Sequence, residues 1–188
     1  KAATRNSHAL VQQMIRLHRD YPCPVLGVEG NHDLAYNSLD SISKQPIGVL
    51  FASGAISRLR EVVLEADGLR VRVVGVPYTP DPSLESLRAI RKQPGDTHLT
   101  VVAHLLAAEK PNEAIEDLYG EPVFRYADLI AEDGPDAWCF GHWHRDQGVV
   151  HIADGLFAKE VAFVNQGAVS RGALTQETLT RAPKVALL

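Results

Sequence analysis

The segment Leu99-Thr100-Val101-Val102-Ala103-His104 is a short, largely apolar run that ends in a histidine. Because apolar and polar residues do not alternate along it, the run predicts a β-strand that is covered on both faces. Further helices and strands are predicted to interleave along the chain, which indicates an α/β fold. The predicted helices cover residues 4–19, 83–92, 109–118 and 126–131, and the predicted strands cover 25–29, 62–64, 70–76, 99–103, 137–140, 149–152 and 160–164.

The composition is that of an ordinary globular chain. Of 188 residues, 45% are hydrophobic and 22% are charged, which argues against disorder. The net charge of −4 provides no overall positive field for nucleic acid or anionic lipid. No apolar run approaches the roughly 20 residues that a membrane helix needs, and the chain opens without a signal peptide. Cys23 and Cys139 lie in apolar stretches and are expected to be buried and reduced, so we expect a cytoplasmic protein with no membrane partner.

Three of the predicted strands run directly into clusters of potential metal ligands. The clusters are Gly30-Asn31-His32-Asp33, His104, and Gly141-His142-Trp143-His144. Ligands of α/β sheets bind outside the carboxyl ends of the strands, so we expect these side chains at one site. Imidazole nitrogens and amide oxygens suit Zn, Mn and Fe. The glycine before two of the clusters would let the backbone turn sharply and approach a ligand closely.

The clusters, in this order, resemble the later motifs of the calcineurin-like metallophosphoesterases. The segment 163–171, Phe-Val-Asn-Gln-Gly-Ala-Val-Ser-Arg, is also similar to a strand and turn of the Mre11/SbcD-like branch of that family. The resemblance extends from about residue 25 to 171. It implies a two-sheet β-sandwich flanked by helices (αββα), in which residues 1–188 form a single calcineurin-like phosphoesterase domain.

The resemblance also implies a site for two divalent metal ions, with Mn as the expected metal and Fe, Zn or Ni as alternatives. Asn31, His104 and His142 would bind the second metal, and His144 would bind the first. Two such ions clamp a phosphoryl oxygen and lower the pKa of a bridging water, so that the resulting hydroxide attacks phosphorus.

Catalytic and substrate-binding roles are likewise implied by the resemblance. His32 would act as the general acid or stabilise the transition state, with Asp33 orienting its imidazole. A carboxylate beside the ring favours the protonated form that donates to the leaving oxygen. Arg171 is the candidate for contact with a substrate phosphate.

Two earlier motifs of that family, Asp-x-His and Gly-Asp-x-x-Asp, do not occur before Gly30, where the only aspartate is Asp20. Asp96-Thr97-His98 fits the first motif as a string, but it precedes its strand, so we expect it at the opposite end from His104. The expected structure is therefore an N-terminally incomplete domain that lacks its first strand-helix-strand unit. Residues 1–188 alone are expected to be inactive.

The expected function is metal-dependent hydrolysis of a phosphodiester or phosphomonoester, with a phosphodiesterase or nuclease favoured. The substrate is a phosphate ester, with nucleic acid among the candidates, although 19 Lys and Arg against 23 Asp and Glu do not favour a large DNA-binding face. The alternative is a non-catalytic scaffold or binding module that keeps the fold. The sequence does not indicate the oligomeric state.

Overall fold

The computed structural model describes residues 7–111, 113–167, 182 and 185–187. Its helices, 3₁₀ turns and strands follow one another in this order: α1 (His8–Arg19), β1 (Leu26–Gly27), η2 (Asn31–Asp33), η3 (Leu39–Lys44), α2 (Pro46–Ala52), β2 (Ser57–Arg58), β3 (Glu61–Ala66), β4 (Leu69–Val76), α3 (Leu84–Arg88), β5 (His98–Leu105), β6 (Ala107–Ala108), α4 (Glu113–Tyr119), β7 (Phe124–Arg125), η4 (Tyr126–Leu129), β8 (Ala137–His142), β9 (Gly148–Asp154) and β10 (Lys159–Asn165).

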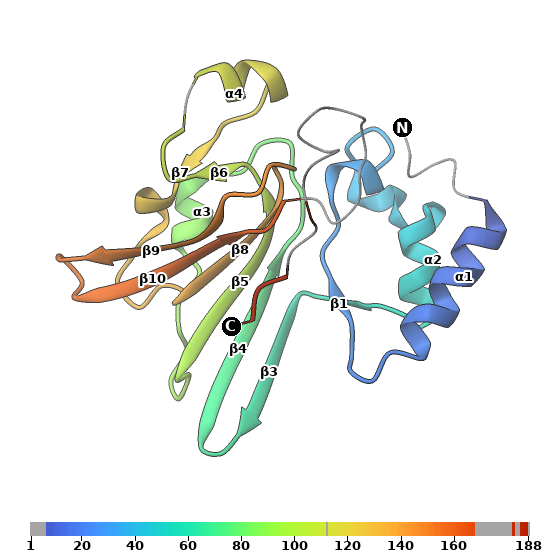
Figure 1. Ribbon diagram of the computed structural model, residues 1–188, viewed down its shortest axis with the longest axis horizontal. Coiled ribbons are helices and arrows are strands. Elements are labelled where there is room, and N and C mark those ends of the chain that lie inside the picture. The colour runs from blue at the N-terminus through green and yellow to red at the C-terminus, as the bar shows by residue number, and fades with distance from the viewer. Residues whose placement is uncertain (1–6, 112, 168–181, 183–184, 188) are drawn as a thin grey trace.

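Six strands form one large sheet in the order β3-β4-β5-β8-β10-β9 (Figure 1). The four inner strands, β4, β5, β8 and β10, are parallel to one another, whereas β3 and β9 pair antiparallel with β4 and β10 at the two outer positions. The carboxyl ends of the four inner strands therefore lie along one edge of the sheet. The helices and the large sheet confirm the predicted α/β fold, and the predicted antiparallel pair near residues 149–164 is confirmed as β9 and β10.

One face of the sheet carries the main hydrophobic core. Val101, Trp138 and Phe163 come from three neighbouring strands and are fully buried. Tyr126 of η4 stacks on Phe163 with ring centroids 4.6 Å apart, and Leu87 of α3 packs into the same cluster. Burial of these large side chains is what fixes the strands side by side, because each contributes on the order of 2 kcal/mol of transfer free energy.

The other face of β5 is less covered. Val101 and Ala103 point to the core face and are fully buried, but Val102 between them is only half-buried. The prediction of a strand covered on both faces is thus right for one face and only partly right for the other.

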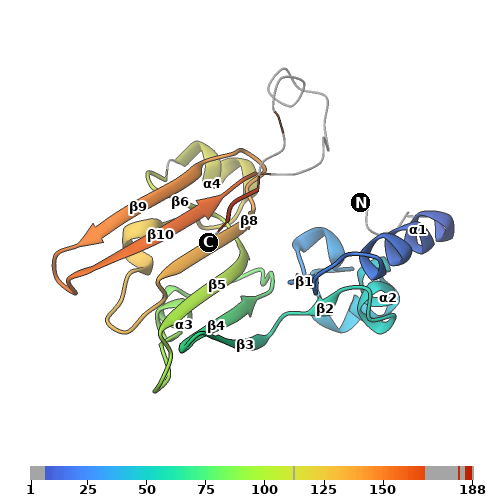
Figure 2. The ribbon, with the colours of Figure 1, turned by 60° about the horizontal axis from the view of Figure 1, so that its bottom comes forward.

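The amino-terminal elements lie beside the large sheet (Figure 2). Ser7 caps α1 by accepting a hydrogen bond from the Leu10 amide at 3.2 Å. The helix is present within the predicted range 4–19, and the predicted start at residue 4 lies outside the described residues. The predicted strand over 25–29 is shorter than expected, because β1 pairs only with the two residues of β2. Within the described ranges, no helix is long and apolar enough to cross a bilayer.

The two cysteines do not share the buried environment that was predicted. Cys23 is exposed, since it lies between two prolines in the loop after α1. Cys139 lies in β8 on the less covered face of the sheet, and burial raises the pKa of its thiol to about 11. The prediction is wrong for Cys23, and Cys139 is a half-buried, protonated thiol.

Candidate functional site

The carboxyl ends of the inner strands bring three aromatic side chains together. His104 is the penultimate residue of β5, His142 ends β8, and Tyr78 follows β4. The two imidazole centroids lie 4.8 Å apart, and the Tyr78 ring contacts both edge-on, at 6.1 Å from His104 and 5.7 Å from His142. Residues far apart in the sequence therefore meet where the parallel topology predicted a site.

The loop after β1 brings Asn31 to the same place. The Asn31 Oδ1 atom lies 3.1 Å from Nε2 of His104, and the two share a hydrogen bond. Two ligand atoms at right angles on one ion, each bonded at about 2.1 Å, would lie about 3 Å apart. The spacing of this pair therefore fits two adjacent positions on a single metal ion.

Two glycines make room for the His104 ring. A Cβ atom on Gly30 would lie 2.7 Å from Cε1 of His104, and one on Gly141 would lie 3.0 Å from Nδ1. Neither glycine has a positive φ. The two glycines therefore allow a close approach to the His104 ring, whereas the predicted approach of the backbone to a ligand stays a prediction. A left-handed turn at these glycines is not seen.

The sharp turn of the backbone falls on His142 instead. His142 has a φ of 91°, a conformation that residues with a side chain adopt at a cost of about 1–3 kcal/mol. Its neighbour in the sheet register is Leu105, which points into the core. The distortion at His142 accompanies the approach of its ring to His104, and this ring is itself buried.

Glu121, in the loop after α4, closes one side of the site. Its Oε1 accepts a hydrogen bond from the Tyr78 hydroxyl at 2.8 Å, and its Oε2 lies 3.1 Å from Nε2 of His142. Burial, with the hydrogen bond and charge of Glu121, raises the pKa of Tyr78 to about 12. Sequence reasoning did not single out Glu121, because no strand end or motif marks it.

The remaining predicted residues lie at the rim or outside the described residues. His32 and His144 are exposed, and both are close enough for their charges to act on His104 and His142. Asp33 accepts a hydrogen bond from the Gly30 amide at 2.9 Å, which closes the loop around Asn31. Burial raises the pKa of the Asp33 carboxyl. Arg171, the predicted substrate-binding residue, lies outside the described residues. The roles assigned to these side chains remain predictions.

Trp143 packs against the small apolar cluster of Leu106, Ala108 and Val123. This packing of a partly buried ring favours a structural role over contact with a substrate.

A buried carboxylate with two partly exposed arginine partners anchors the start of the loop after β1. Glu29 is fully buried and is paired with Arg58 and with Arg60, whose Nη1 lies 2.8 Å from Oε2. Burial alone would raise the pKa of Glu29, but the hydrogen bonds of Arg60 and the backbone and the positive charges of both arginines hold it below its usual range. The Glu29 carbonyl accepts a hydrogen bond from the Tyr78 amide, so this pair ties the loop to the end of β4.

Both central imidazoles are held neutral. Burial, with the charges of His142, His32 and His144, lowers the pKa of His104 to about 3. Burial also lowers the pKa of His142, although the negative charge of Glu121 opposes this. A neutral imidazole keeps one lone pair, which is the form that binds metal.

The lowered pKa of His104 predicts that the metal-free chain loses stability as the pH falls from 6.5, the ordinary histidine value, toward 3. The unfolded chain binds more protons in this window, so protonation favours unfolding. Urea unfolding at about pH 7 and about pH 5 should show a lower free energy of unfolding at the lower pH. In His104→Asn the free energy of unfolding should change less between the two pH values. An equal change in the wild type and the variant would contradict the burial of a neutral His104 ring.

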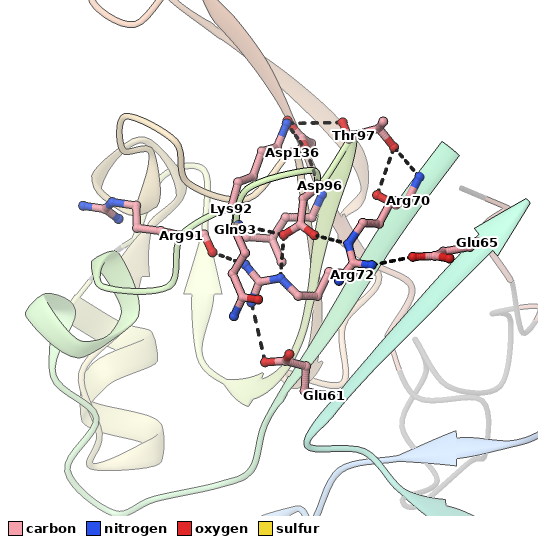
Figure 3. A network of polar contacts seen from close by, with 11 residues as sticks. Glu61, Glu65, Arg70, Arg72, Arg91, Lys92, Gln93, Asp96, Thr97 and Asp136 are labelled. Atoms are coloured by element: carbon pink, nitrogen blue, oxygen red, sulfur yellow. Dashed lines mark hydrogen bonds and ion pairs between the residues drawn. The ribbon is translucent and has the colours of Figure 1, made fainter. Parts of the chain in front are cut away.

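Asp96-Thr97-His98 lies at the amino end of β5, as predicted, and therefore away from His104. The side chain of Asp96 is buried within a network of ion pairs and hydrogen bonds (Figure 3). Its Oδ2 accepts a hydrogen bond from Nε of Arg72 at 2.6 Å, and its Oδ1 lies 3.3 Å from Nε of Arg70. This carboxylate is occupied in holding β4 against the turn that precedes β5.

Across the described ranges, no group of three or more His, Cys, Asp and Glu side chains is arranged to hold a metal ion. A metal at the strand ends would therefore also need the amide oxygen of Asn31. The donor set of two neutral imidazoles and one amide oxygen suits a first-row divalent ion.

The fold and this edge of the sheet agree with one family. The family model of the calcineurin-like phosphoesterases matches residues 3–146, and the chain belongs to this family. A comparison with curated proteins gave no match. Membership implies a hydrolase with metal-dependent phosphoesterase activity. The match is to the family as a whole and does not single out the Mre11/SbcD-like branch.

Proposed function

We propose that the chain forms the carboxyl-terminal part of a dinuclear phosphoesterase site, in a cytoplasmic enzyme of the Mre11/SbcD-like kind that hydrolyses phosphodiesters. The observation that carries this proposal is the convergence of Asn31, His104 and His142 at one edge of the sheet, with two atoms of the set 3.1 Å apart. Mn²⁺ is the proposed metal. Asp-x-His and Gly-Asp-x-x-Asp segments would have to complete the site.

Each residue of this chain has a distinct part in the proposed reaction. Asn31, His104 and His142 would hold one ion, and His144 would contribute to the other. Bound divalent ions supply charge stabilisation for the phosphoryl group and an activated water. His32 lies exposed on the 3₁₀ turn beside the ligands, from where it could donate a proton to the leaving oxygen.

A non-catalytic scaffold remains the second candidate. The strained backbone of His142, which has a φ of 91°, disfavours it. Such strain costs free energy and is concentrated at functional sites, so a fold without a catalytic role would gain nothing from it.

The activity test compares the protein encoded by the complete gene with residues 1–188 on bis-p-nitrophenyl phosphate with Mn²⁺. We expect turnover from the former that EDTA abolishes, and little from the latter. His32→Ala should lower turnover on the order of 10²-fold or more at nearly normal metal content, whereas His142→Ala should lower the metal content itself.

His151→Ala, on the exposed edge strand β9, is the control and should change neither turnover nor metal content. Normal turnover in both site variants would contradict the assigned roles. Absence of turnover from the complete protein with its metals bound would favour the scaffold.

A further inference from the structure

The segment from α4 to β7 contacts the His142 loop at several points that no motif marks. The Tyr119 ring packs edge-on against His142 with centroids 5.4 Å apart, and Tyr119 also hydrogen-bonds the backbone of His144. Two residues further on, Glu121 contacts His142 through its carboxylate. This segment therefore packs directly against the candidate site.

An apolar cluster keeps the segment in place. Trp143, from the His142 loop, packs with Ile115 and Tyr119 of α4 and with buried Val123. The Val123 amide also lies 3.4 Å from Oε1 of Glu116. The segment that carries Glu121 is therefore held in place by packing. The Glu121 carboxylate contacts His142, and its side chain is only 19% exposed.

The hydrogen bonds of Glu121 define which nitrogen of His142 carries the proton. An ionised carboxylate can only accept hydrogen bonds. Oε1 accepts from the Tyr78 hydroxyl, so Oε2 accepts from Nε2 of His142. With its proton on Nε2, the neutral imidazole has its lone pair on Nδ1.

We propose that Glu121 is a positioning residue that fixes His142 as the Nε2–H tautomer and presents Nδ1 to the metal. This inference deepens the proposed function and rests on it for the metal. A ligating histidine commonly donates its other N–H to a carboxylate, which fixes the ring and strengthens the ligand. Here the carboxylate comes from a segment outside the histidine and asparagine clusters, with Tyr78 holding its other oxygen.

The test measures the tautomer of His142 in the 188-residue chain, labelled with ¹⁵N-histidine and free of metal. Long-range ¹H–¹⁵N correlation spectra distinguish a protonated from an unprotonated ring nitrogen, and His142→Asn assigns the signals. We expect a single Nε2–H tautomer in the wild type and a mixture in Glu121→Ala. Glu121→Gln should restore much of the preference, because its amide oxygen still accepts a hydrogen bond.

Glu113→Ala, on the exposed side of α4, is the matched control and should leave the His142 signals unchanged. Tyr78→Phe provides a second test that leaves Glu121 intact. It should lower the fraction of the Nε2–H tautomer of His142 less than Glu121→Ala does. An Nδ1–H tautomer in the wild type, or identical His142 signals in Glu121→Ala and Glu113→Ala, would overturn the proposal.

Metal titrations separate this proposal from the proposed function. Glu121→Ala should weaken Mn²⁺ binding about 10–100-fold. Zn²⁺ added to the wild type should shift the ¹⁵N resonance of Nδ1 of His142, while Nε2 keeps its proton. Loss of the Nε2 proton on adding Zn²⁺ would overturn the proposal. A wild-type chain that binds neither ion would contradict the proposed function, whereas the metal-free tautomer would still decide the role of Glu121.

Discussion

Asp96→Ala is expected to destabilise the fold by about 3 kcal/mol, the lower end of the cost of breaking a buried ion pair. The substitution leaves the Arg72 guanidinium, whose side chain is 4% exposed, without its main counter-charge. Glu61, at 3.5 Å, and the Arg91 carbonyl still contact Arg72, which limits the loss. The Gln93 amide also loses its acceptor on Asp96.

Urea unfolding of the metal-free chain measures this effect. Glu65→Ala is the control, because it removes an exposed partner of Arg70 from the same network and should cost less than about 1 kcal/mol. Mn²⁺ binding should be unchanged in any Asp96→Ala protein that remains folded. A loss of stability no larger than that of Glu65→Ala would contradict the structural role, and a loss of Mn²⁺ binding by folded protein would place Asp96 at the metal.

Gly30→Ala is expected to weaken Mn²⁺ binding on the order of tenfold or more and to destabilise the fold by about 1–3 kcal/mol. The new Cβ would lie 2.7 Å from the His104 ring, which cannot move freely away because Gly141 lies on its Nδ1 side. Gly30 has φ −98° and ψ 170°, which alanine adopts without strain. The effect therefore reports the clash with His104 alone.

Calorimetric titration with Mn²⁺ and urea unfolding together check this prediction. Gly155→Ala in the β9–β10 turn is the control, because a Cβ there meets no atom within 4 Å and the backbone φ is not positive. Unchanged affinity in Gly30→Ala would show that the tight packing of glycine against His104 is irrelevant to the metal.

Much of the site could be predicted because strand ends are visible in the sequence. An apolar run followed by His104 or by Gly141-His142 indicates both the strand and the edge at which the side chain lies, and the parallel order of β5 and β8 then brings the two rings together. The position of Asp96 before the same run also placed it correctly at the opposite end of the sheet.

Other features depended on tertiary packing that leaves no periodic signal. Glu121 lies between α4 and β7, and only the folded chain brings it to Tyr78 and His142. The positive φ of His142 is a second such feature, because no pattern in the sequence marks it. Cys23 was predicted to be buried from its apolar neighbours, but two flanking prolines hold it in an exposed loop.

The central claim is that Asn31, His104 and His142 form one metal-binding group at the carboxyl edge of the sheet. The most direct test is the dissociation constant for Mn²⁺ of the 188-residue chain, compared with those of its His142→Ala and His98→Ala variants. We expect the wild type and His98→Ala to bind one ion with equal affinity, and His142→Ala to bind at least roughly tenfold more weakly. Equal binding by all three proteins, or no binding by the wild type, would contradict the claim.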